Sequence, residues 1–181
     1  EDKDLEKIPF IKPKKDSEEL NYLQQKRKEL GGYLPQRKDK SPNLEAPDEK
    51  IFRSFLKGSG KEDAASTMAM IQMLSKLMKD KNFGKLIVPI IPDESRTFGM
   101  ESLFRQAGIY APEGQKYDPV DKESLLYYKE AKNGAIMEEG ITESGCMAEF
   151  IAAGTTYLTH GINTIPFYFF YSMFGFQRTG D

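Results

Sequence analysis

Two apolar runs without charged residues in their interiors limit what this chain can fold into. Residues 85–91 read KLIVPII, and residues 165–172 read IPFYFFYS, with five consecutive aromatic side chains at 167–171. Short, continuous apolar runs bounded by polar residues are typical of buried strands. Strands that lack alternation fit a parallel sheet whose two faces are both covered. Pro89 is out of place in a central strand, because proline has no N–H to donate to a neighbour.

Helical segments separate these runs. Apolar residues recur at helical spacing from Asp63 to Asp80. Further helices are expected at 16–31, 48–56, 99–107 and 144–158, with a weak strand at 135–137 and a strand over the whole of 165–172. In the first of these helices, Asp16 and Glu19 have the spacing of a capping box. Alternation of helices and strands predicts an α/β fold, a parallel sheet with flanking helices.

Composition excludes several classes of protein. The 181 residues include 26 Lys and Arg against 28 Asp and Glu, a net charge of −2, which argues against a nucleic-acid partner. One cysteine, Cys146, allows neither an internal disulfide nor a cysteine-based zinc cluster. The uncharged stretch 150–177 is interrupted by Thr, Gly, Asn and Pro and is a poor membrane span. The start lacks an initiator Met and a signal-like apolar segment, so we expect a cytoplasmic protein and a piece of a longer chain.

Charge divides the chain into two parts. About half of all charged side chains lie in residues 1–62, which make up a third of the sequence. We therefore expect 1–62 to be a charged helical linker segment and 63–181 to contain the core.

Polar side chains follow each expected strand. Asp93, Glu94 and Arg96 follow the first apolar run, Glu143 precedes the helix at 144–158, and residues 171–178 (YSMFGFQR) follow the aromatic run. In open parallel sheets, ligands bind beyond the carboxyl ends of the strands. Taken alone, each group has a plainer structural interpretation: loop ion pairs, a glutamate that favours a helix N-terminus, and core aromatics. Cys146, near the same helix start, could have a lowered pKa or be a small buried residue.

Four stretches resemble one family. They are residues 88–101 (VPIIPDESRTFGME), 103–110 (LFRQAGIY), 139–143 (EGITE) and 165–178 (IPFYFFYSMFGFQR). The chain is similar over nearly its whole length to the homodimeric bacterial type of pyruvate dehydrogenase, the decarboxylating component of the pyruvate dehydrogenase complex. It looks like the first part of the pyrimidine-binding domain, preceded by a linker. Residues 144–149, Ser95 and His160 depart from the family pattern.

The resemblance implies a cofactor and roles for particular residues. The family uses thiamine diphosphate and magnesium to decarboxylate pyruvate, and passes the acetyl group to the lipoyl carrier of a dihydrolipoamide acetyltransferase. Glu143 matches the glutamate that binds N1′ of the aminopyrimidine, and burial of such a carboxyl raises its pKa. Phe174 matches a stacking aromatic, and Tyr171 matches a tyrosine of the same pocket. Arg178 matches an arginine that pairs with Asp93 or with substrate. Asp93 and Glu94 match two catalytic acids, and Asp121 matches an acid proposed to link two active sites.

Two rival hypotheses remain open. The chain could be a non-catalytic α/β interaction module, or part of another thiamine-dependent enzyme such as a transketolase. Glu143 together with Tyr171 and Phe174 favours catalysis over the first rival, and the long YSMFGFQR string argues against the second. The metal and diphosphate ligands of the family lie outside this sequence, so we expect the fragment alone to be inactive.

Overall fold

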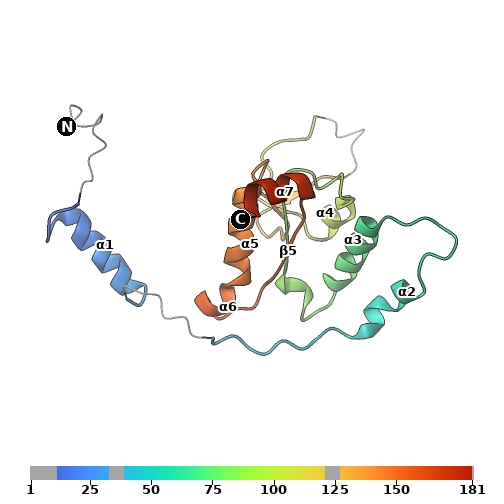
Figure 1. The fold of residues 1–181 in the computed structure, drawn as a ribbon, viewed down its shortest axis with the longest axis horizontal. Helices are drawn as coiled ribbons and strands as arrows, with labels where there is room; N and C mark the ends of the chain where they lie inside the picture. Colours follow the sequence, from blue (N-terminus) through green and yellow to red (C-terminus); the bar gives the residue numbers. More distant parts are fainter. Residues whose placement is uncertain (1–11, 33–38, 121–126, 181) are drawn as a thin grey trace. The chain divides into compact units, whose positions relative to one another are not determined.

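The computed structural model describes residues 12–32, 39–120 and 127–180 (Figure 1). The chain divides into two compact units, residues 1–38 and residues 39–181. In the described residues, no helix is long and apolar enough to cross a membrane. The predicted boundary at residue 62 between a linker and the core stays a prediction.

The first unit contains one described helix, α1 (Glu18–Glu29). Its N-cap is Ser17, whose hydroxyl accepts a hydrogen bond from the Leu20 amide at 3.4 Å. The prediction that Asp16 caps this helix is wrong, because an N-cap needs extended backbone and Asp16 has a left-handed φ of 66°. The helix ends at Glu29, just before the expected Gly31 and Gly32, and the positive φ of Gly31 allows the chain to turn away there.

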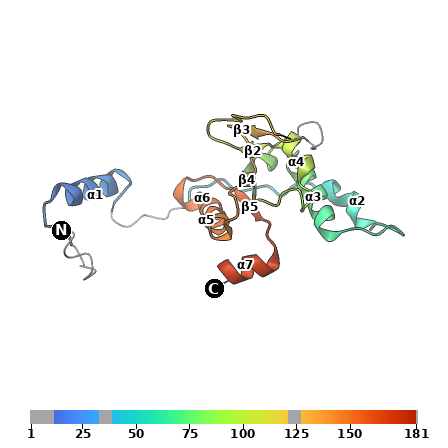
Figure 2. The ribbon, with the colours of Figure 1, turned by 90° about the horizontal axis from the view of Figure 1, so that it is seen from above.

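The second unit is built on a parallel sheet, as the sequence predicts. β1 (Ile87–Ile91) is central, between β4 (Met137–Glu138) and β5 (Ile165–Tyr168). Both pairings are parallel. The strand order requires crossovers, and helices supply them. Seen from above, α5 (Glu143–Gly154) lies on one side of the sheet, and α3 (Ser66–Leu77) and α4 (Glu101–Gln106) lie on the other (Figure 2).

Pro89 sits in the central strand without breaking the sheet. The neighbouring Ile90 carbonyl accepts a bond from Phe169, on the β5 side. Alternate residues of a parallel strand direct their backbone groups to opposite sides, so the Pro89 nitrogen faces β4. Pairing with β4 begins only at Ile90. Pro89 therefore lacks its N–H at a position where β1 is not paired with β4.

Four shorter helical segments accompany these elements, and the one at 84–86 was not predicted. The segment expected at 48–56 forms η2 (Glu49–Phe52), a 3₁₀ turn, and α2 (Arg53–Leu56). A second 3₁₀ turn, η3 (Gly84–Leu86), leads into β1. The helix expected at 144–158 breaks at Thr155 into α5 and α6 (Thr156–Thr159).

Four elements differ from expectation. The aromatic run is not a strand throughout: β5 ends at Tyr168, and α7 (Ser172–Thr179) begins soon after it. The strands β2 (Ile109–Tyr110) and β3 (Glu130–Ala131) form a second, two-stranded parallel sheet. Each has two residues, too few to give a hydrophobic pattern. In Figure 2 this small sheet lies at the opposite end of the view from α7.

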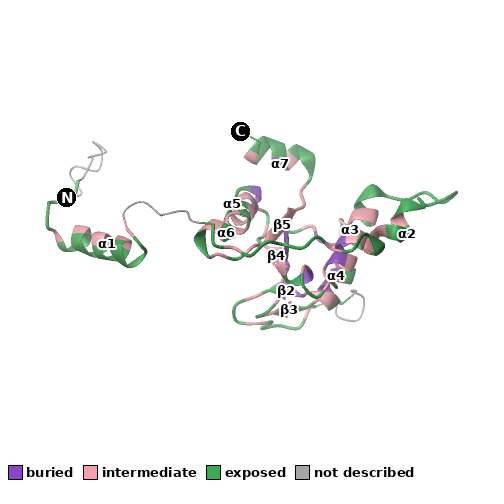
Figure 3. Cartoon of the chain, turned by 90° about the horizontal axis from the view of Figure 1, so that it is seen from below, coloured by how far each residue is buried: buried purple, intermediate pink, exposed green. Residues whose placement is uncertain are grey.

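The core lies between β1 and the helices α3 and α4 (Figure 3). Ile71 and Leu74 of α3 pack with Ile87 and Ile91 of β1 and with Phe104 of α4, and all five are at most 1% exposed. Because side chains alternate along a strand, Ile90 points to the other face, where α5 lies. Burial on both faces explains why residues 87–91 read as a continuous apolar run.

Gly134→Ala is expected to destabilise the fold by about 1–3 kcal/mol. A Cβ at this position would overlap the backbone of Ile109, and backbone cannot rotate aside as a flexible side chain can. Gly154→Ala is the matched control, because its Cβ would meet only Pro166, at 3.9 Å. The control should be neutral or stabilising by up to about 1 kcal/mol. Equilibrium urea denaturation measures both, and equal stabilities for the two variants would contradict the close approach.

Candidate active site

The three predicted polar groups follow three strands of one parallel sheet. Residues 92–97 follow β1, Glu143 follows β4 after a short loop, and Tyr171 follows β5. Because carboxyl ends of parallel strands lie at the same edge, these groups share one side of the molecule. The structure joins Glu143, Phe174, Tyr171 and Arg178 into one cluster and places Asp93 and Glu94 in a pocket beside it.

Glu143 is held at the first position of α5. The side chain of Thr142 caps the helix by accepting the Gly145 amide at 3.2 Å. From β5, the hydroxyl of Tyr168 donates to the Glu143 backbone carbonyl at 3.2 Å. Glu143 is only 3% exposed. A carboxyl is thus buried at a helix N-terminus, where the helix dipole favours its charged form.

Arg178 of α7 binds this carboxyl. Its guanidinium donates to Oε2 of Glu143, and the two form an ion pair. The hydrogen bond from Arg178 outweighs burial and lowers the pKa of Glu143 below its usual range. The expectation of a raised pKa is wrong here, because it considered burial without a cationic partner. Of the two partners expected for Arg178, Asp93 or a substrate carboxylate, Asp93 is not the one that the structure shows, since the guanidinium is bound to Glu143.

A row of aromatic rings extends from the ion pair. The Arg178 guanidinium carbon lies 5.2 Å from the centre of the Phe174 ring. Tyr171 meets Phe174 edge to face at 6.5 Å, and Phe98 lies 4.9 Å from Tyr171 on the other side. A charged carboxylate beside a half-buried aromatic surface suits a flat heterocycle that stacks on a ring and presents a polar edge.

Thr97 links this cluster to the loop after β1. The Tyr171 hydroxyl donates to Thr97 Oγ1 at 2.7 Å, and Thr97 in turn donates to the Glu94 carbonyl at 2.7 Å. Thr97 was not among the predicted site residues. Its partner is 74 positions away in the chain, so no local pattern could have identified it.

Asp93 and Glu94 line a pocket of about 510 Å³ at the ends of β1 and β4. Inside it, buried Ser95 donates to Glu138 Oε1 at 2.6 Å. Burial raises the pKa of Glu138, with Asp93 and Glu130 adding to the effect, while the bond from Ser95 and the charge of Arg96 oppose it. Catalytic roles for Asp93 and Glu94 stay predictions.

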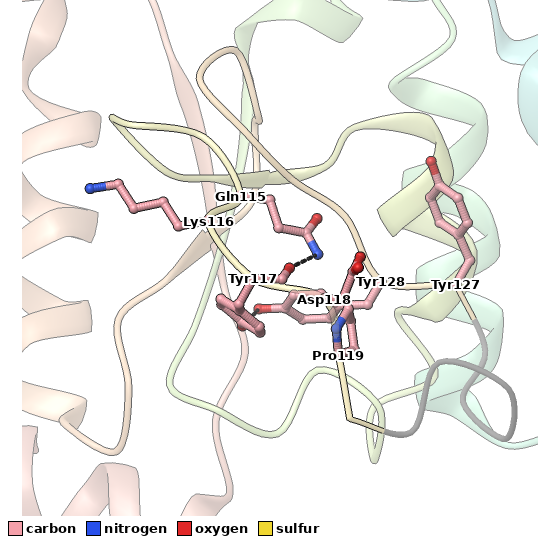
Figure 4. Close-up of a pocket in the computed structure, with 7 residues that line it drawn as sticks. All are labelled: Gln115, Lys116, Tyr117, Asp118, Pro119, Tyr127 and Tyr128. Atoms are coloured by element: carbon pink, nitrogen blue, oxygen red, sulfur yellow. Dashed lines mark hydrogen bonds between the residues drawn. The ribbon is translucent and has the colours of Figure 1, made fainter.

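A second pocket, of about 580 Å³, adjoins the first (Figure 4). Tyr117 and Tyr128 line both, and each donates a hydrogen bond to Glu130 Oε1 at 2.8 Å. The Gln115 amide reaches the Tyr117 carbonyl at 3.1 Å, as Figure 4 shows. None of the predicted site residues that the structure describes lines this pocket. Asp121 falls outside the described residues.

Cys146 lies near the start of α5. Cys146 is buried, and burial together with three nearby glutamates raises the pKa of its thiol to about 12. The interpretation of Cys146 as a small buried residue is therefore confirmed.

Across residues 12–32, 39–120 and 127–180, no three His, Cys, Asp or Glu side chains are grouped so as to hold a metal ion.

Comparison with known proteins gives the family. Residues 42–181 match the family described as "Pyruvate dehydrogenase E1 component middle domain". Proteins named pyruvate dehydrogenase E1 component are similar to 99% of this chain: it is 53% identical to the one from Pseudomonas aeruginosa, 51% to that from Cupriavidus necator and 48% to that from Escherichia coli K12. The chain spans 20% of the length of each. It belongs to the pyruvate dehydrogenase E1 component family, as its sequence predicted.

Proposed function

We propose that this chain is part of a full-length enzyme that decarboxylates pyruvate with thiamine diphosphate and passes the acetyl group to a lipoyl-bearing dihydrolipoamide acetyltransferase. One observation carries the proposal: a buried carboxylate, Glu143, lies beside half-buried Phe174 and within the reach of α7. An interaction module without catalysis has no need to bury a carboxylate next to an aromatic surface, since a buried charge is costly even when it is paired.

The side chains fit the pyrimidine half of the cofactor. Phe174 offers a ring face for stacking, and a carboxylate has two oxygens, of which Arg178 binds Oε2. The same carboxylate can then accept a second hydrogen bond, from the N–H of a protonated ring nitrogen of a bound heterocycle. The residues present therefore suit an aminopyrimidine, while the diphosphate and its magnesium require ligands from elsewhere.

Each residue has a part in the chemistry. Thiamine diphosphate, when bound, supplies the thiazolium carbon at which pyruvate is decarboxylated. Arg178 keeps Glu143 ionised, so the carboxylate can accept and return a proton at the pyrimidine nitrogen. Phe174 and Tyr171 orient the ring, and Thr97 fixes Tyr171 relative to the loop that carries Asp93 and Glu94.

Several finer features belong to the same proposal. They are magnesium as the metal, a homodimer as the active form, a cytoplasmic location, a linker role for residues 1–62, a pyrimidine-binding role for 63–181, and active-site roles for Asp93, Glu94 and Asp121. They rest on the resemblance to the family described above.

The test uses the full-length enzyme with thiamine diphosphate, magnesium and carboxyl-labelled pyruvate. We expect cofactor-dependent release of labelled CO2, and acetylation of an added lipoyl domain. Omission of the cofactor is the control. If no CO2 is released under conditions in which the protein is folded, the chain is a non-catalytic interaction module; preference for a ketose phosphate would identify a transketolase-like enzyme.

The isolated 181-residue chain is expected to bind thiamine diphosphate weakly, with a Kd well above the micromolar range. The cofactor's charge is concentrated in its diphosphate, and hard cations such as Mg²⁺ need oxygen ligands, which the described residues do not group together. Isothermal calorimetry with cofactor and magnesium measures this. Micromolar binding by the chain alone would show that the pyrimidine pocket is sufficient.

A further inference from the structure

The carboxyl groups of Glu139 and Glu149 lie close together beside α5, and neither belongs to the Glu143–Arg178 ion pair. Glu139 lies in the loop between β4 and α5, and Glu149 lies on α5 itself. The two side chains are within hydrogen-bonding reach of each other. Two ionised carboxylates have only acceptor atoms, so a hydrogen bond between them requires a proton on one of the two.

Gly145 allows this close approach. A Cβ at Gly145 would lie 2.7 Å from Glu139 Oε1, closer than a carbon and an oxygen can pack. Gly145 and Glu149 are four residues apart on one helix and therefore lie on the same face. Glu139 thus folds back over the first turn of α5, toward Glu149.

The surroundings disfavour two charges. Glu149 Oε2 is buried and has no hydrogen-bond partner. Within the described parts of the chain, neither Glu139 nor Glu149 forms an ion pair with a Lys or Arg. Glu149 is partly buried and Glu139 is exposed, so the cost of a charge without a cationic partner falls on Glu149, which takes up a proton instead. Burial and the neighbouring Glu139 raise the pKa of Glu149 to about 7.

We propose that Glu139 and Glu149 share one proton near neutral pH, and that this shared proton holds the loop before Glu143 against helix α5. When the proton leaves, two carboxylates face each other and repel. The loop they hold contains Thr142, the N-cap of α5, and Glu143 follows it directly. A consequence for catalysis, which rests on the proposed function, is that loss of the proton loosens the position of Glu143.

Glu138 of β4, directly before Glu139, also has a pKa raised by burial. Other titratable or charged groups lie nearby. From α5 these are the Cys146 thiol and Glu143, from β5 the Tyr168 hydroxyl, and from α7 Arg178. The pKa values of Cys146 and Tyr168 are each raised to about 12, mainly by burial. Glu143 has a lowered pKa because Arg178 binds it. Because the pKa of Glu138 is also raised, the comparison of Glu149→Gln with the wild type identifies the carboxyl that releases the proton.

Infrared spectroscopy of the full-length protein in D2O, without cofactor, detects the shared proton directly. We expect the C=O stretch of a protonated carboxyl to persist at pH 6 and to fall as the pH rises through about 7. In Glu149→Gln, the titrating band should be missing. Glu62→Gln is the matched control, an exposed carboxyl whose replacement should leave the band intact. A band that is absent in the wild type at pH 6, or that titrates in Glu149→Gln as it does in the wild type, overturns the proposal.

Thermal unfolding provides a second readout. The folded-state pKa of Glu149 lies above its ordinary value of 4.5, so the pair contributes stability at acid pH that is lost as the pH rises through about 7. The amide introduced by Glu149→Gln donates a hydrogen bond at every pH, so this variant should not show the loss, and its Tm should exceed that of the wild type at pH 8. Equal pH dependence in both proteins contradicts a shared proton. Neither readout depends on cofactor or turnover, so the result is independent of the proposed function.

Discussion

Glu143→Gln in the full-length enzyme is expected to lower the rate of pyruvate decarboxylation about 10²–10⁴-fold, the usual range for loss of a general acid–base group. The amide keeps the shape of the side chain and can still hydrogen-bond, but it cannot ionise. It also loses the ion pair with Arg178, which holds the carboxylate in place. Because the pocket keeps its shape, KM for pyruvate should change far less than kcat.

The control for this variant is Glu62→Gln, which makes the same change at an exposed position. Its rate should equal that of the wild type. Glu143→Ala should be worse than Glu143→Gln, because it also leaves a cavity beside α7. A Glu143→Gln enzyme with a rate within a few-fold of the wild type would mean that Glu143 only begins a helix.

Arg178→Met is expected to destabilise the fold by about 2 kcal/mol at neutral pH. Breaking a buried ion pair costs about 3–5 kcal/mol, and breaking an exposed one costs at most about 1 kcal/mol. The Arg178 side chain is 46% exposed and that of Glu143 only 4%, so the pair falls between these limits. Lys26→Met breaks the pair with Glu29, in which both side chains are 48% exposed, and should cost at most about 1 kcal/mol.

The pH dependence of stability gives Arg178→Met a distinct signature. In the wild type, the pKa of Glu143 is lowered below 4.5, so its contribution is present above pH 4.5 and is lost as the pH falls through the folded-state pKa. Without Arg178, burial alone acts and raises that pKa. In the variant, the free energy of unfolding should therefore fall as the pH rises through the raised pKa of Glu143, which is the opposite of the wild type. Urea denaturation from pH 4 to pH 8 measures this; parallel curves for variant and wild type would show that Arg178 does not set the charge of Glu143.

The elements with strong local patterns were predictable. Residues 87–91 form the central strand, because β1 is buried on both faces. The periodic segment from Asp63 to Asp80 contains α3. The helix α7 was not predicted, because SMFGFQRT contains a glycine and two aromatics, which are poor helix formers. There, packing decides: Gly175 is buried against Phe170, where a Cβ would overlap the ring.

The candidate site was predictable in its residues but not in its contacts. Glu143, Tyr171 and Phe174 were identified from residue type and resemblance, and the structure brings them together with Arg178. That Arg178 binds Glu143, 35 positions away, depends on how α7 packs against α5, which no local pattern encodes. The same holds for the bond between Thr97 and Tyr171 and for the meeting of Glu139 with Glu149.

The central claim is that Glu143 transfers a proton at the cofactor. Exchange of the thiazolium C2 proton of bound thiamine diphosphate, followed by NMR after acid quench, isolates that step from substrate binding and from acetyl transfer. In the full-length enzyme with cofactor bound, we expect Glu143→Gln to exchange this proton about 10²–10⁴-fold more slowly than the wild type, and Glu62→Gln to match the wild type. Exchange at the wild-type rate in Glu143→Gln would contradict the account, because the carboxyl would then have no part in removing the proton.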